Sequence, residues 1–360
     1  MKKNISLICM GIFLSINFTA QTLFKPKNAT LFQKTVGYIT SKQYYDKAVL
    51  NRNWNSEKYL DKINTKIKNK EYLSQRINKL LLKAKESLGS FYDDDKKIII
   101  PWSGGKDSSS LLALSLIFFP EKEYYLLTVI NGLCENIHNP KIRLKKVLEL
   151  ISDKVENPKV KHIYIDNVKD IEDLAINTAF DDKRMMGCPA ICSACKIIME
   201  FSMASATKKL DAQKITMGYV NYQGMQDWPE QNPIQIKLLK EELKKVDIYT
   251  ESPLYNVFKY PFDPVLLLAY LGFDFKNLKL EMKCSGGGLN PLNLNDNLFE
   301  SFLKYKVVKV KNHREDMIGE ILAPEYIVEE GFKLEKFKKL IPQMKKLKKN
   351  KDFTKGAFLG

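Results

Sequence analysis

The sequence predicts an α/β fold, in which a parallel sheet is covered by helices on both faces. Three observations support this prediction: short apolar runs, helical apolar patterns between them, and a glycine-rich loop directly after the first run. Strands that alternate with helices form parallel sheets, and such sheets bind ligands at the carboxyl ends of their strands. The chain has 360 residues, 44% of them hydrophobic and 28% charged, which is ordinary for globular domains.

Residues 1–95 are expected to form a largely helical N-terminal extension. Residues 1–21 combine two lysines with an apolar stretch, as secretory signals do. Asn17 interrupts that stretch, Phe18 occupies a position where signal cleavage favours a small residue, and the stretch is too short for a secure membrane span. We therefore favour a cytoplasmic protein with no membrane association, with a signal segment as the alternative. Residues 55–90 carry apolar side chains at helical spacing among lysines, which predicts one or two amphipathic helices.

The stretch that organises the chain runs from Lys96 to Leu112. Residues 98–101 predict the first strand, and residues 111–119 predict a helix. Between them, two glycines allow a sharp turn that points several backbone N–H groups at one place, where the helix N terminus adds positive potential. The preferred ligand is a phosphate chain. The candidate contacts are Ser103, Gly104, Gly105, Lys106, Asp107 and Ser108.

This Ser-Gly-Gly-Lys-Asp-Ser loop lacks the spacing of a Walker loop and of a GxGxxG motif. It resembles the PP-loop of the ATP pyrophosphatase superfamily, whose domain is a Rossmann-like sheet of the same class. The resemblance covers residues 96–290 and implies ATP and Mg²⁺ as cofactors, cleavage of ATP to AMP and pyrophosphate, and adenylation of a substrate. It implies that Lys106 and the loop amides stabilise the departing charge, and that Asp107 assists magnesium or phosphate positioning.

Further apolar runs predict the remaining strands of the sheet, at residues 124–130, 162–165 and 214–217. Between the first two of these runs, residues 143–151 predict a helix. The strands are followed by polar residues or glycine, which a parallel sheet would bring to one edge. We expect Asn131, Asp166 and the segment from Gly218 to Tyr222 to hold the adenosine half of ATP.

Cysteines form the second candidate site. There are six: Cys9, Cys134, Cys188, Cys192, Cys195 and Cys284. Cys192 and Cys195 form a C-x-x-C pair at the predicted start of a helix, where thiolates point the same way and the helix dipole favours their charge. Such a pair can grip a metal ion or one edge of a cluster. We interpret Cys134, which follows the second strand, as a half-buried thiol, with a sulfur carrier as the alternative.

The pair also resembles the C-x-x-C of the tRNA 2-thiouridine and 2-thiocytidine synthetases. These are PP-loop enzymes in which a much later cysteine, matched here by Cys284, completes the ligands of a [4Fe–4S] cluster. Three ligands leave one iron open for a sulfide that attacks the adenylated base and expels AMP. The resemblance implies sulfur transfer to a tRNA base or a related nucleobase, with tRNA and a sulfur donor protein as partners. We also expect a homodimer.

Some features favour another reaction class. The synthetases continue with Gly-His-Asn-x-Asp-Asp after the fourth strand, whereas residues 218–223 lack the acidic pair. If Cys188 supplies a fourth thiolate, a structural Zn²⁺ replaces the reactive cluster. Residues 222–230 loosely resemble a passage of the 7-cyano-7-deazaguanine synthases, which are zinc-bearing ligases. The alternative function is therefore a zinc-bearing PP-loop ligase or sugar amidotransferase that adenylates a small molecule.

Residues 291–360 are expected to form a mixed, basic C-terminal extension. Within it, residues 298–310 predict a helix followed by a strand. Lysines gather in residues 345–349, and the whole chain carries a formal charge of +16. Both features fit phosphate contacts with RNA, and both also fit solvated helix ends. The glycine run at residues 286–288 is interpreted as a close backbone approach to the cysteine site.

Overall fold

The structure is a computed structural model. It describes residues 70–93, 95–220, 232–258, 263–273, 282, 284–285, 290–291, 295–315, 338–355 and 357–358. The signal-like segment 1–21, the start of the 55–90 helical pattern, residues 221–223 of the 218–223 passage, all of the 222–230 passage, and the glycine run 286–288 lie outside the described residues.

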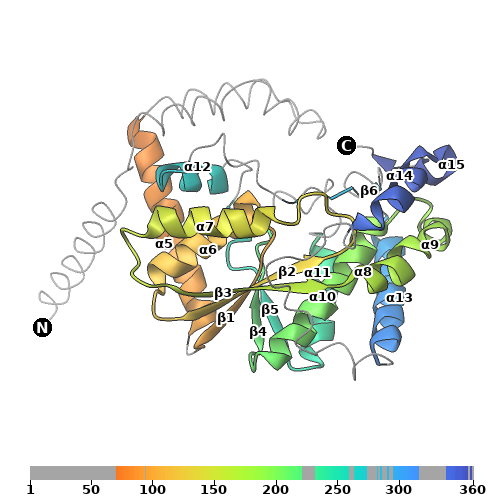
Figure 1. Ribbon diagram of the computed structural model, residues 1–360, viewed down its shortest axis with the longest axis horizontal. Coiled ribbons are helices and arrows are strands. Elements are labelled where there is room, and N and C mark those ends of the chain that lie inside the picture. The colour runs from red at the N-terminus through yellow and green to blue at the C-terminus, as the bar shows by residue number, and fades with distance from the viewer. Residues whose placement is uncertain are drawn as a thin grey trace, which may run out of the picture.

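A five-stranded sheet forms the centre of the molecule (Figure 1). Its strands are β1 (Lys97–Pro101), β2 (Glu123–Ile130), β3 (Lys159–Asp166), β4 (Lys214–Thr216) and β5 (Tyr249–Glu251). The spatial order is β3-β2-β1-β4-β5, and every neighbouring pair is parallel. The predicted parallel α/β fold is therefore confirmed, with β5 as a strand that the sequence pattern did not predict.

Helices cover both faces of this sheet (Figure 1). One face carries α5 (Lys70–Tyr92), α6 (Lys106–Phe118), α7 (Asn139–Ile151) and α12 (Asp263–Tyr270). The opposite face carries α10 (Ile191–Lys209) and α11 (Pro233–Lys244). Alternate strand residues separate the two cores: Ile98 and Ile100 pack in the first, and Ile99 packs in the second. This alternation follows from the two-residue period of a strand.

A third core lies beyond the carboxyl end of β2 and joins segments from far along the chain. It contains α8 (Val168–Ile171), the π-helical turn η2 (Glu172–Ile176), α9 (Ala179–Met186), α13 (Asp296–Glu315), α14 (Ile341–Lys349) and α15 (Lys351–Thr354). A two-residue pair, β6 (Asn290–Pro291) with β7 (Ala357–Phe358), accompanies them. The C-terminal segments therefore pack into the same body as the sheet.

The predicted helix-then-strand at residues 298–310 is wrong, because these residues lie within the single helix α13. Phe299, Phe302 and Leu303 are fully buried there, and so is Val310, at helical spacing. Among the described helices, none is by itself long and apolar enough to cross a membrane. Helices α9 and α10 meet that criterion only as a pair, and they are bent by 116° relative to each other.

Candidate functional site

The glycine-rich loop joins β1 to α6 at the carboxyl edge of the sheet. Gly104 has φ +72°, and a Cβ there would lie 3.2 Å from both Arg143 Cβ and Pro140 Cα on α7. Arg143, which is fully buried, also donates from Nε to the Gly104 carbonyl at 3.0 Å. Only glycine meets both the left-handed backbone and the close approach of α7. Helix α7 therefore fixes the shape of this turn.

The N terminus of α6 has the properties of an anion site. Gly105 is its N-cap residue, and no side chain caps it. The first N–H groups of a helix have no intrahelical partner, and they carry a partial positive charge. Ser103 accepts from the Gly105 N–H at 3.2 Å, and its hydroxyl lies 3.4 Å from that of Ser108. The predicted loop residues thus converge around the start of α6.

Lys106 and Asp107 pair with each other at the mouth of this loop. Lys106 Nζ lies 2.8 Å from Asp107 Oδ2 and 2.9 Å from Oδ1. Their side chains are 21% and 18% exposed, so a ligand can reach both. The pair places a cation and a carboxylate beside the helix N terminus.

Gly218, which follows β4, lies beside the first turn of α6. A Cβ on Gly218 would be 3.6 Å from the backbone N and Cα of Ser108. The next residue, Tyr219, donates its hydroxyl to the buried carboxylate of Glu200 on α10, and Lys196 Nζ lies 4.8 Å from the centre of the Tyr219 ring. Burial raises the pKa of Glu200. These contacts fix the end of β4 against α10. Strands β2 and β4 lie on opposite sides of β1, and open parallel sheets bind ligands where the strand order changes direction in this way.

Asn131 lies at the end of β2 but faces the cysteines. Its Nδ2 donates to Cys195 Sγ at 3.7 Å, and its Oδ1 accepts from the Leu133 N–H at 3.0 Å. Asp166 accepts from the Val168 N–H at 3.1 Å and so stabilises the start of α8. The structure thus brings Gly218 to the glycine-rich loop and Asn131 to the thiols.

Thiols gather directly beside Asn131. Cys134 forms an isolated antiparallel bridge with Cys284, so residues 150 positions apart face each other. The hydrogen-bonded thiol of Cys284, burial and the nearby Cys195 together raise the pKa of Cys134. Cys192 lies one turn before Cys195 on α10 and is partly exposed. The surroundings of this group are therefore rich in soft sulfur donors, which suit iron–sulfur clusters and Zn²⁺.

Cys188 lies before the start of α10 and makes other contacts. Its Sγ donates to the Met186 carbonyl at 3.6 Å, and burial raises the pKa of the thiol while Lys183 opposes that rise. Within the described residues, no group of three or more His, Cys, Asp or Glu side chains is already arranged around a metal position. The cysteines thus match a metal or cluster in donor type, while Cys195 accepts from Asn131 and Cys188 donates to a backbone carbonyl.

Two residues of the site, Arg143 and Cys134, were not assigned these places from the sequence. Arg143, Val147 and Ile151 share the buried face of α7. The position of an arginine on this apolar stripe was therefore the sequence feature that could have predicted the burial of Arg143. The position of Cys134 after a strand indicated the correct edge of the sheet. The sequence could not indicate its bridge partner Cys284, because that pairing joins distant segments.

Comparisons with known proteins found similarity only among solved structures. No family model matches the chain, and no curated protein does. A 4-thiouridine synthetase, solved in complex with RNA and with bound ATP, aligns with 12% identity over 62% of this chain and has a TM-score of 0.44. The match spans about half of that protein, 54% of its length. The U34-tRNA thiolase NcsA from Methanococcus maripaludis, solved with its [4Fe–4S] cluster, aligns with 12% identity, covers 74% of this chain and 88% of its own, and has a TM-score of 0.38.

Proposed function

We propose that this protein is an ATP-dependent sulfurtransferase. It adenylates an oxygen of a tRNA base or a related nucleobase, releases pyrophosphate, and exchanges the activated oxygen for sulfur with loss of AMP. One juxtaposition supports the proposal above all others. An uncapped helix N terminus after β1 and a group of thiols after β2 share the carboxyl edge of one parallel sheet.

In this proposal, the phosphates of ATP bind at the start of α6. The N–H groups of the loop and of the first helical turn donate to the phosphate oxygens, as helix N termini do for anions. Lys106 exchanges its bond to Asp107 for a phosphate oxygen, and Asp107 becomes available to Mg²⁺, which prefers carboxylate oxygens and phosphates. The same donors stabilise the charge that develops on pyrophosphate as it leaves. Gly218, beside Ser108, lines the adenosine end.

Cys192, Cys195 and Cys284 would hold an iron–sulfur cluster, which supplies sulfur-transfer chemistry when bound. Asn131 orients this site, since its N–H group donates to Cys195 Sγ. Hydrogen bonds of this kind to a ligand sulfur tune the properties of the bound metal.

The first test measures the phosphate site. Lys106→Ala and Asp107→Ala should each lower pyrophosphate release from ATP, in the presence of unmodified tRNA, by roughly a hundred- to a thousand-fold. Lys145→Ala is the matched control, because its side chain is 81% exposed on α7. It should leave the rate unchanged, and all three variants should keep the wild-type thermal midpoint. Full activity in both loop variants would contradict the assignment.

A second measurement separates this function from a ligase. Protein purified without oxygen is analysed for iron, zinc and acid-labile sulfide. About four irons with matching sulfide, lost in Cys192→Ala, would support sulfur transfer. About one zinc without sulfide would instead support a zinc-bearing ligase that adenylates a small acid, and sulfur transfer would be abandoned.

A further inference from the structure

Cys134 and Cys284 face each other across an antiparallel bridge that joins two distant segments of the chain. Beside the bridge, the Ser285 N–H donates to the Leu133 carbonyl at 2.8 Å. This hydrogen bond joins the residue after one cysteine to the residue before the other, so the two cysteines form a non-hydrogen-bonded pair. In such a pair the facing Cα atoms are about 4.5 Å apart, and both side chains lie on the same face.

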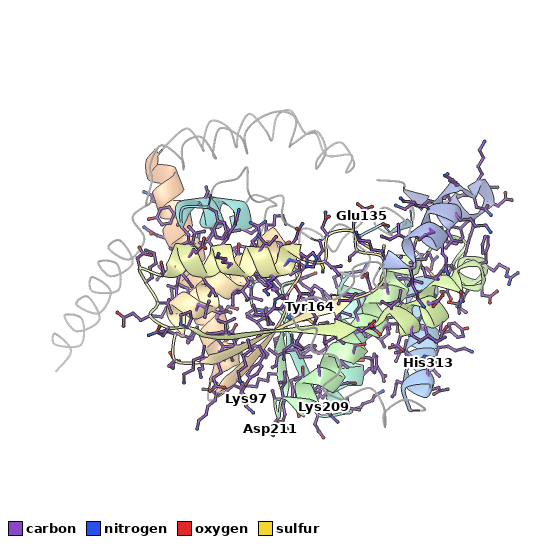
Figure 2. All side chains as sticks on the ribbon, in the orientation of Figure 1. Lys97, Glu135, Tyr164, Lys209, Asp211 and His313 are labelled. Carbon is purple, nitrogen blue, oxygen red and sulfur yellow. The ribbon has the colours of Figure 1, made fainter. Side chains whose placement is uncertain are left out.

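This backbone geometry is suitable for a disulfide. The Cα atoms of bonded cysteines are about 4.4 to 6.8 Å apart, so a bond between the two sulfurs needs no backbone movement. A second contact stabilises the same pairing, because the Ser285 hydroxyl donates to Glu135 Oε1 at 3.4 Å; Glu135 is labelled in Figure 2. Both cysteines are present as thiols in the structure. The bridge therefore holds two thiols in register for oxidation.

The two thiols differ in their access to solvent. Cys134 is 4% exposed and belongs to the third core. Cys284 is partly exposed and packs against that core from outside. A small oxidant from solvent therefore reaches Cys284 first, and Cys134 is the thiol that lies behind it.

We propose that Cys134 and Cys284 form a reversible disulfide when the protein meets hydrogen peroxide. The Cys284 thiolate attacks one peroxide oxygen, the O–O bond breaks, hydroxide leaves, and Cys284 becomes a sulfenic acid. The Cys134 thiol then attacks the sulfenic sulfur, and its proton leaves with the hydroxyl group as water. The two cysteines thereby lose two electrons, which reduce the peroxide to water. A dithiol reverses the reaction by thiol–disulfide exchange and is itself oxidised.

The consequence of this disulfide rests on the proposed function, which assigns Cys284 to the cluster. A cysteine ligates a metal as a thiolate, and a sulfur that is bonded to a second sulfur is not a thiolate. The disulfide and the cluster therefore exclude each other at Cys284. Oxidation would stop sulfur transfer until a dithiol restores the ligand, and the reduced protein would keep its three ligands and its open iron.

The first experiment maps the bond in the full-length protein after a chelator has removed metal. Wild type, Cys134→Ser and Cys192→Ser are treated with a small excess of hydrogen peroxide, alkylated, and digested without reductant for mass spectrometry. Wild type and Cys192→Ser should give linked peptides that contain Cys134 and Cys284, and dithiothreitol should separate them. In Cys134→Ser, the Cys284 sulfenic acid has no resolving thiol beside it, so dimedone should label Cys284 far more strongly than in wild type.

The second experiment repeats the oxidation on wild type that carries its cluster. Linked peptides should form about tenfold more slowly, because the cluster holds Cys284 as a ligand. Equal rates with and without the cluster would overturn the place of Cys284 in the proposed function and would support the disulfide alone. A metal-free wild type in which Cys284 stays unlinked, or links to Cys192 or Cys195, would overturn the disulfide and leave the proposed function intact.

Discussion

At the scale of single residues, the shape of the glycine-rich loop depends on the backbone of Gly104. Its φ of +72° lies in the left-handed region, and α7 leaves a Cβ there only 3.2 Å from its nearest neighbours. Gly104→Ala should therefore lower the free energy of unfolding by about 1 to 3 kcal/mol and weaken Mg·ATP binding, because the loop must shift away from Arg143. Urea unfolding and calorimetric titration with Mg·ATP measure the two effects.

Gly89 provides the control for this substitution. It lies within α5, where an added Cβ would come no closer than 3.5 Å, to the Phe119 ring. Gly89→Ala should stabilise the protein by about 0.5 to 1 kcal/mol and leave ATP binding unchanged. Equal effects of the two substitutions would mean that Gly104 has no special backbone role.

The residues of the two candidate sites differ in how far the sequence could predict them. The loop is contiguous, so residues 103–108 predict both its position and its ligand class, and the structure confirms the position between β1 and α6. The thiol group combines residues from three distant segments, and only Cys192 and Cys195 are close in sequence. Cys134 joins it through a bridge to Cys284 that no local pattern encodes.

At the scale of elements, α13 is held by a buried ion pair. Lys306 Nζ lies 2.6 Å from Asp182 Oδ2 on α9, both side chains are 1% exposed, and Lys306 also donates to the Leu174 carbonyl and the Thr178 hydroxyl. Burial lowers the pKa of Lys306 and raises that of Asp182, while the opposite charge of each partner counteracts the shift. Loss of either partner would therefore leave the other charge buried without compensation.

Lys306→Ala should lower the free energy of unfolding by about 3 to 5 kcal/mol, because it leaves the carboxylate of Asp182 buried without its cation. Lys304→Ala, which removes an exposed partner of Glu300, should change it by less than about 1 kcal/mol. Denaturant unfolding compares the two. The double substitution Lys306→Met with Asp182→Leu should recover most of the loss, and a double variant as unstable as Lys306→Ala would contradict this account.

The same lysine explains why the sequence pattern of this element was misleading. Lys306 occupies a buried position between Phe302 and Val310, so the apolar stripe of α13 is interrupted where its charge appears. Val307, Val308 and Val310 then resemble a strand, because β-branched residues favour strands. Packing of these residues against α9 and α10 instead stabilises a helix.

The sequence pattern did not predict strand β5 for a different reason. Of its three residues, only Thr250 is buried, so the strand has no apolar run.

At the scale of the whole molecule, exposed lysines gather on a helix that packs near the carboxyl edge of the sheet. Helix α14 follows Leu340, whose side chain reaches within 2.8 Å of a Cβ built on Gly132, at the carboxyl edge of the sheet. Ile341 and Met344 bury one face of α14, while Lys345, Lys346 and Lys349 are exposed. Figure 2 shows Glu135 toward this helix and Lys97, Lys209 and Asp211 on the opposite side. Cations thus lie beside the candidate site.

Removal of the chain from residue 344 onward is an unsuitable test of RNA binding, because it would also delete buried packing. Met344 and Phe353 are both fully buried, and Phe353 packs against Phe180 with 5.0 Å between ring centres. Charge reversal on the exposed face keeps this packing. The informative variant is therefore the triple substitution Lys345→Glu, Lys346→Glu and Lys349→Glu.

This triple variant should bind unmodified tRNA more weakly and with a smaller dependence on salt. The slope of log K against log salt is negative. Each lysine–phosphate interaction that the substitutions remove should reduce its magnitude by about 0.7 to 0.9, so removal of all three should reduce it by about two to three. Lys208→Glu with Lys209→Glu reverses exposed charges at the far end of α10 and should affect the slope much less. Fluorescence anisotropy over a salt series gives both slopes. Equal weakening in the two variants would mean that only net charge attracts RNA, whereas weakening confined to the α14 variant would support binding of tRNA across the edge that carries the phosphate loop and the thiols.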